Sequence, residues 1–118
     1  MPNYPHGSPC WVDLGSPDPD RAAHFYSSLF GWTIDQPDEG GYRLCRLGGE
    51  LVAALGPGDD PGRPYWTTSF AVADVVETAA RITDLDGEVV SEPADAGEFG
   101  RSAVAIDPVG APISLWQP

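Results

Sequence analysis

The chain has 118 residues, 42% of them hydrophobic, which is the size of one globular domain with enough apolar side chains for a core. Its formal net charge is −12, from 18 acidic residues against six basic ones, so we expect neither nucleic acid nor an anionic membrane as a partner. No apolar run approaches the roughly 18 residues of a membrane helix, and the N-terminus lacks a basic and apolar leader, so we expect a cytoplasmic protein.

The first half of the sequence predicts a strand, a helix and three more strands. The opening strand is "PCWVDLGS", residues 9–16. The helix follows with Asp18 as its N-cap, Pro19 at the first helical position, apolar residues at 22, 25, 26 and 29, and Gly31 as its stop. Three strands then follow at residues 32–35, 42–47 and 50–55.

The second half repeats this plan. A shift of 56 residues places Asp18 on Asp74 and Gly31 on Gly87 without a gap, which predicts a second helix with Asp74 as cap and Gly87 as stop. A strand precedes it at residues 66–73, and three follow at 88–92, 102–106 and 112–116. We therefore predict an α+β fold in a single domain, 1–118, with two βαβββ modules at about 7–56 and 65–118, joined by the Pro/Gly/Asp loop 56–65.

These features resemble the vicinal oxygen chelate superfamily. The resemblance rests on the duplicated module, on the segment D-x-x-x-A-x-x-FY-x-x-L-x-GW that begins at Asp18, and on the turn Asp107-Pro108-x-Gly110 before the last strand. The longer strings "PCWVDLGSPDPDRAAHFYSSLFGW" and "DPVGAPISLWQP" are similar to a bacterial branch of glyoxalase/bleomycin-resistance-like proteins. The resemblance implies a concave mixed sheet whose cup holds the ligand, and a homodimer.

Alternate side chains of a strand lie on opposite faces, which allows the cup to be assigned. If Val12 and Leu14 pack under the helix, Trp11 and Asp13 face the cup, and the shift of 56 gives Thr67 and Ser69 the same place. Aligning "GELVAAL" with "GAPISLW" puts Ala53 opposite Ser114 and Leu55 opposite Trp116. The predicted ligand-binding residues are Trp11, Asp13, Ala53, Leu55, Thr67, Ser69, Ser114 and Trp116. Arg43 and Arg46 lie on opposite faces, so at most one of them enters the cup.

The resemblance also implies four metal-ligand positions, which metal-using members fill with His, Gln or Glu from the first and last strands of each module. Those positions match Trp11, Ala53, Thr67 and Ser114 here. None of these side chains is an ordinary ligand of a divalent metal. We therefore predict no metal and no cofactor.

Two functions fit a cup lined by tryptophans and a few polar groups. The first is binding of a small hydrophobic or aromatic molecule, as in drug-binding resistance proteins. The alternative is a cofactor-independent enzyme acting on an aromatic or polyketide-type molecule, with Asp13 as general base and Thr67, Ser69 or Ser114 polarising a carbonyl. A third hypothesis is a regulatory or structural half of a once larger protein.

Overall fold

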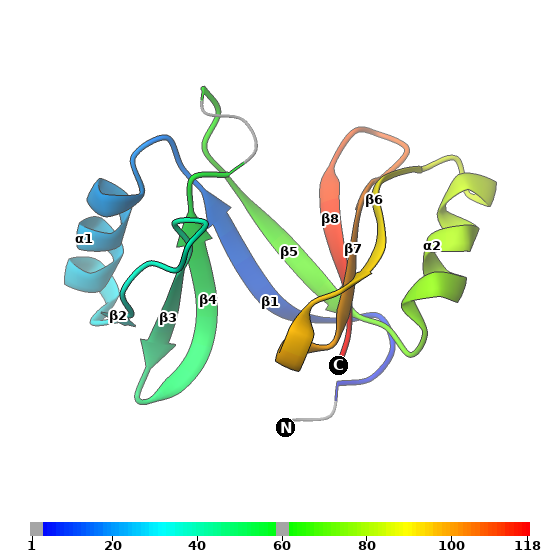
Figure 1. The fold of residues 1–118 in the computed structure, drawn as a ribbon. Coiled ribbons are helices and arrows are strands. Elements are labelled where there is room, and N and C mark those ends of the chain that lie inside the picture. Colours follow the sequence, from blue (N-terminus) through cyan, green and yellow to red (C-terminus); the bar gives the residue numbers. More distant parts are fainter. Residues whose placement is uncertain (1–3, 59–61) are drawn as a thin grey trace. The chain divides into compact units, whose positions relative to one another are not determined.

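The computed structural model describes residues 4–58 and 62–118, which form two compact units. One unit is Trp11–Trp66, and the other joins the chain up to Cys10 to Thr67–Pro118. The elements of the first half are β1 (Ser8–Gly15), α1 (Pro19–Phe30), β2 (Thr33–Ile34), β3 (Arg43–Leu47) and β4 (Glu50–Gly56) (Figure 1). The second half has β5 (Tyr65–Ala71), α2 (Val75–Asp84), β6 (Glu88–Asp95), the short 3-10 helix η1 (Gly97–Phe99), β7 (Arg101–Ile106) and β8 (Pro112–Gln117).

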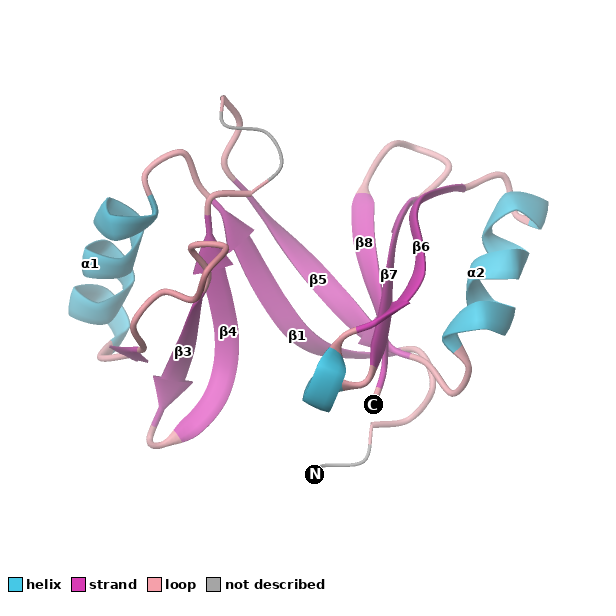
Figure 2. Ribbon diagram, viewed as in Figure 1, coloured by secondary structure: helices cyan, strands magenta, loops and turns pink. Residues whose placement is uncertain are grey.

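This order confirms the predicted α+β fold with its repeated βαβββ plan. Figure 2 distinguishes the helices, strands and loops of each half by colour. Of the predicted loop 56–65, residues 59–61 lie outside the described residues, while Gly56 ends β4 and Tyr65 begins β5. The single domain 1–118, with modules at 7–56 and 65–118, stays a prediction.

Helix α1 begins and ends where its capping residues predict. The Asp18 carboxylate accepts a hydrogen bond from the Arg21 amide at 3.1 Å, and Pro19 occupies the first turn. Gly31 has a left-handed backbone, with φ of 76°, and its amide donates to the Ser27 carbonyl at 2.9 Å. Local sequence therefore fixes both ends of this helix.

Helix α2 begins at its predicted cap but ends earlier than predicted. The Asp74 carboxylate accepts from the Glu77 amide at 3.1 Å. The helix stops at Asp84, and the left-handed residue is Asp86, with φ of 68°, rather than Gly87. Gly87 has a different role, because a Cβ there would lie 2.9 Å from the carbonyl oxygen of Ile106. The glycine permits close approach to β7.

Each unit contains a four-stranded mixed sheet. In one unit the strand order is β2-β3-β4-β1, and in the other it is β5-β8-β7-β6. The pairs β1/β4 and β5/β8 are parallel, and the remaining pairs within each unit are antiparallel. The same arrangement in both halves is the structural counterpart of the sequence repeat.

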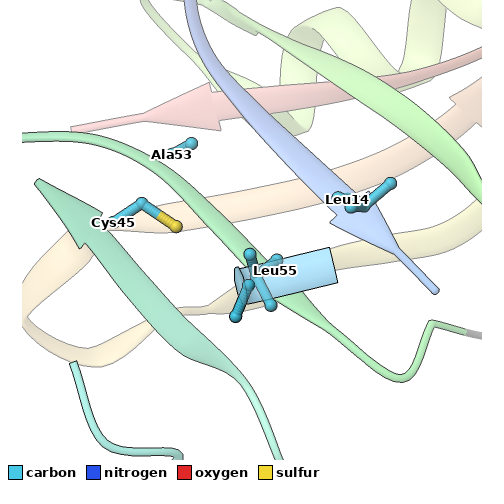
Figure 3. Close-up of a cluster of buried hydrophobic side chains, with 5 residues drawn as sticks. Leu14, Cys45, Ala53 and Leu55 are labelled. Carbon is cyan, nitrogen blue, oxygen red and sulfur yellow. The ribbon is translucent and has the colours of Figure 1, made fainter. Parts of the chain in front are cut away.

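Each helix covers one face of the sheet in its unit. Below α1 the core consists of Leu14, Ala23, Cys45, Ala53 and Leu55, four of which Figure 3 labels. Below α2 it consists of Val72, Val75, Ala103 and Leu115. Burial of these apolar side chains is the main stabilising contribution in each unit. Neither helix among the described residues has the length and apolar character needed to cross a membrane.

Candidate small-molecule site

Strand β1 turns Trp11 and Asp13 away from α1. Leu14 is buried in the core beneath the helix, and Val12 packs against the same core. Because side chains alternate along a strand, Trp11 and Asp13 lie on the opposite face. The structure thus places these two residues on the face that α1 does not cover.

Trp11 and Asp13 form a hydrogen-bonded pair on that face. The indole Nε1–H of Trp11 donates to Oδ1 of Asp13 at 3.0 Å, and both residues are half-buried. Burial raises the pKa of the Asp13 carboxyl, and the hydrogen bond from Trp11 opposes this change in part. The pair offers an aromatic surface beside a carboxyl group of increased basicity.

Strand β4 does not present the residues predicted for the ligand. Val12 pairs with Ala53 and Leu14 pairs with Leu55, so Ala53 and Leu55 share the helix-covered face. Both are completely buried in the core. The prediction that Ala53 and Leu55 face the ligand is therefore wrong. Ala54, which pairs with Asp13, takes that place.

A β-bulge in strand β4 explains the error. Cys45 pairs with Ala53, but the next residue, Arg46, pairs with Leu51. Val52 is therefore an extra residue that β4 contains at this point relative to β3. Beyond the bulge the alternation changes phase. Leu51 therefore shares the face of Ala54, whereas strict alternation from Leu51 would put Ala53 and Leu55 on that face.

Strand β3 settles which of its arginines lies on the face of Asp13. Arg43 pairs with Leu55 and forms an ion pair with Asp20 of α1, which places it on the helix-covered face. Arg46 lies on the other face and forms a hydrogen-bonded ion pair with Asp35 at 3.2 Å. Its charge is therefore already matched by a carboxylate.

The other unit presents a face of hydroxyl groups and one indole. Leu115 is buried beneath α2, so its neighbours Ser114 and Trp116 lie on the uncovered face. Ser69 pairs with Ser114 across β5 and β8 and lies on the same face, as does Thr67 two positions earlier. Ser69 is almost fully buried, with 4% exposed, and the Ser114 hydroxyl donates to the Ala103 carbonyl at 3.3 Å.

Two neighbours contact Trp116 on this face. Its indole Nε1–H donates to the carbonyl oxygen of Phe99 in η1. The ring of Tyr4 meets it edge-on, with the ring centroids 6.0 Å apart and the planes at 64°. Sequence reasoning missed Tyr4, because it stands before the first predicted strand, where no periodic pattern exists.

Two surface hollows lie elsewhere. One, of about 310 Å³, adjoins α1 and is lined by residues that include Phe25, Tyr26 and Pro64. The other, of about 240 Å³, adjoins α2 and includes His6 in its lining. None of the eight predicted ligand-binding residues lines either hollow. Six of the eight lie on uncovered faces, Trp11 and Asp13 in one unit and Thr67, Ser69, Ser114 and Trp116 in the other, whereas Ala53 and Leu55 lie in the core.

The side chains on these faces do not fit a divalent metal. Of the four metal-ligand positions that the resemblance implies, Trp11, Thr67 and Ser114 lie on uncovered faces, whereas Ala53 lies in the core and Ala54 is its neighbour on the uncovered face. None carries an imidazole, a carboxylate or a thiolate. Within residues 4–58 and 62–118, no group of three or more His, Cys, Asp or Glu side chains is placed to hold a metal ion.

Comparison with known sequences finds the glyoxalase-like domain family, whose model matches residues 11–116. The chain is 39% identical over 135 residues to the anthracycline biosynthesis protein DnrV of Streptomyces peucetius, covering 99% of this chain and 49% of that protein. It is 41% identical over 122 residues to the putative glyoxylase CFP32 of Mycobacterium bovis, covering 97% and 47%. The chain thus spans about half the length of these curated relatives.

Solved structures with the same fold include enzymes. A homoprotocatechuate 2,3-dioxygenase from Brevibacterium fuscum has a TM-score of 0.71 at 21% identity, covering 96% of this chain and 33% of that one. The methylmalonyl-CoA epimerase of Streptomyces coelicolor has a TM-score of 0.66 at 20% identity, covering 96% and 98%. At such identities the likeness concerns the fold alone.

Proposed function

Because this chain belongs to the glyoxalase-like domain family and has the vicinal oxygen chelate fold, we propose that it binds a small hydrophobic or aromatic molecule without a metal or cofactor. In each unit the candidate surface for such a molecule is the sheet face that the helix leaves uncovered. The name of DnrV, an anthracycline biosynthesis protein, supports a planar polycyclic ligand, since anthracyclines are fused aromatic ring systems.

The hydrogen-bonded pair of Trp11 and Asp13 carries this proposal. An indole offers a large rigid surface on which a planar ring stacks. The indole Nε1–H donates a hydrogen bond to Oδ1 of Asp13, at 3.0 Å between Nε1 and Oδ1. This hydrogen bond fixes the orientation of both side chains before a ligand arrives. Such preorganisation reduces the entropy that binding costs, while the second carboxylate oxygen stays available for a ligand hydroxyl.

The hydroxyl-bearing face of the other unit is, taken by itself, a second candidate surface for such a molecule. Thr67 and Ser114, which are half-buried, offer neutral hydroxyl groups, which suit the hydroxyl and carbonyl substituents of an aromatic molecule, whereas Ser69 is almost fully buried. Because these groups carry no charge, they do not add to the net charge of −12 that would repel an anionic ligand.

Calorimetric titration with quinizarin, a neutral dihydroxyanthraquinone, tests the proposal. The parent chain should bind it, and Trp11→Ala should weaken binding by at least the roughly 0.5–1.5 kcal/mol of a stacking contact. Trp11→Phe is the matched control, because it keeps an aromatic ring for stacking while it removes the indole N–H that donates to Asp13. No binding by the parent, or equal affinities for the parent and Trp11→Ala, would contradict the proposal.

The raised pKa of Asp13 favours one alternative, a cofactor-independent enzyme in which Asp13 is a general base. Anthrone, a planar aromatic ketone with an acidic methylene group, is a suitable probe. The carboxylate would take a methylene proton and leave the enolate. The carboxylic acid would exchange that proton for a deuteron from heavy water and return the deuteron to the carbon. The parent should accelerate deuterium incorporation seen by NMR, and Asp13→Asn should lose about 10²–10⁴ of this rate while still binding anthrone. No acceleration by the parent rules out this alternative for anthrone-like ketones.

We also propose that the chain forms a homodimer with two-fold symmetry. The curated relatives are about twice its length, so one of their chains has room for two such domains. Sedimentation velocity over a hundredfold range of concentration tests this assembly. A monomer at every concentration would contradict it.

A further inference from the structure

The segment before β1, residues 4–7, is fixed on the unit that contains β5 and β8, and we call it the N-terminal arm. The Gly7 amide donates to the Ala71 carbonyl at 2.7 Å, and the Ala73 amide donates to Nδ1 of His6 at 3.1 Å. These bonds bracket the end of β5. The arm lies outside the glyoxalase-like family match, which begins at residue 11, so nothing in that match accounts for it.

A turn within the arm directs Tyr4 back toward the sheet. The Ser8 amide donates to the Pro5 carbonyl at 3.0 Å, which closes this turn. Tyr4 then meets the indole of Trp116 edge-on, at 6.0 Å between centroids, and is itself 37% exposed. The hydrogen edge of one ring against the π face of another is the favoured geometry of such pairs.

We propose that the N-terminal arm positions Trp116 as a stacking surface for the ligand, with Tyr4 as the contact and His6 as the anchor. This inference rests on the proposed small-molecule function. The carbonyl of Phe99 holds the indole N–H, and the ring of Tyr4 limits rotation of the same indole from another side. Two contacts of different kinds thus keep one rotamer of a half-buried tryptophan.

The energetic consequence is preorganisation. Without the arm, Trp116 keeps its hydrogen bond to Phe99 but samples more orientations about it. Ligand binding would then have to immobilise the ring, and fixing a side chain of this kind weakens binding about two- to tenfold. Tyr4 is therefore a positioning residue, and its removal should change affinity without removing any ligand contact.

The experiment uses the full chain labelled with 5-fluorotryptophan, which gives one fluorine resonance for each of the four tryptophans. Trp116→Phe assigns the resonance of Trp116. Tyr4→Leu removes the ring but keeps an apolar side chain, and His6→Ala removes the acceptor for the Ala73 amide. We expect both variants to shift or broaden the Trp116 resonance alone. Tyr4→Phe, the matched control, should leave it as in the parent because the ring remains.

The same variants are then titrated with quinizarin. A change in the Trp116 resonance together with two- to tenfold weaker binding in Tyr4→Leu and His6→Ala supports the proposal. An unchanged resonance in both variants overturns it, whatever the affinity. If the Trp116 resonance changes in these variants but their affinity for quinizarin does not, the arm plays no part in ligand binding and that part of the proposal is overturned. If the parent does not bind quinizarin while the resonance responds, the proposed function fails for this ligand and the positioning of Trp116 by the arm stands.

Discussion

The bulge in β4 predicts a large difference between two leucines of one strand. Leu55 is completely buried, and the residues around it in the core include Ala23 and Ala53, which are too small to fill a space left beside them. Leu55→Ala should therefore cost about 3–5 kcal/mol of unfolding free energy, the upper part of the range for buried leucine. At about 4 °C per kcal/mol for a chain of this length, the melting temperature should fall by about 12–20 °C.

Leu51 is the matched control in the same strand. It is 36% exposed and lies on the opposite face, so its truncation leaves no enclosed cavity and should cost about 1 kcal/mol. Urea unfolding followed by circular dichroism gives both values with the same reference state. Strict alternation would put Leu51 and Leu55 on one face with comparable losses. Equal costs for the two variants would therefore refute the bulge and the facing of β4 derived from it.

Three further predictions concern single residues. Burial raises the pKa of Asp13 above the ordinary 3.8, so the folded state binds the proton more tightly than the unfolded state does. As the pH rises from 4 through the raised pKa, the unfolding free energy of the parent should therefore fall relative to that of Asp13→Asn. Urea titrations at several pH values measure this difference. Gly100→Ala should lower the unfolding free energy, measured in urea, by about 3 kcal/mol, because φ of Gly100 is +92° and a Cβ there would lie 2.1 Å from a β8 carbonyl oxygen. Gly97 is the control. Its φ is +64° and no atom lies near its Cβ position, so Gly97→Ala should cost about 1 kcal/mol. Hydrogen bonds from the backbone amides of Ala111 and Val109 lower the pKa of Asp107 below its ordinary 3.8. The stability that these bonds contribute is present above pH 3.8 and should be lost as the pH falls through the lowered pKa. Asp107→Ala should remove this contribution to the pH dependence of the melting temperature.

The architecture followed from local signals because those signals act within a few residues. Asp18 and Gly31 satisfy the backbone groups at the two ends of α1, and their effect is independent of the rest of the chain. The repeat then gave the order of the remaining strands. The end of α2 was misjudged because Gly87 is required by the nearby carbonyl of Ile106, which is a contact between elements and leaves no local pattern.

The facing of β4 failed for a related reason. Side-chain alternation can be read from sequence only while the strand pairs one residue with one residue. The extra residue Val52 is defined by its pairing with β3, and the sequence "LVAAL" offers two equally apolar phases. In β8 no register shift interrupts the pairing with β7, and there Ser114 and Trp116 lie on one face as alternation predicts.

The contacts of the site residues also lie beyond sequence reasoning. Trp11 and Asp13 are two positions apart on one strand, so their common face was predictable, but their hydrogen bond depends on side-chain rotamers. The partners of Trp116 come from residues 4 and 99, which are far from it in the chain. Such contacts arise only when separate segments pack together.

The equivalent strands β1 and β5 differ on their uncovered faces in a way that supports the proposed function. On the helix-covered faces Leu14 corresponds to Phe70, which is also apolar, although Val12 corresponds to Thr68. On the uncovered faces the equivalent residues differ in kind, since Asp13 corresponds to Ser69. A core favours apolar residues in both halves, whereas the side chains of a face that contacts a ligand can differ with the groups that they bind. The divergence of a carboxylate and a hydroxyl at one repeated position therefore fits the proposal that these faces bind ligands, because each unit then offers a different polar group to a ligand of its own.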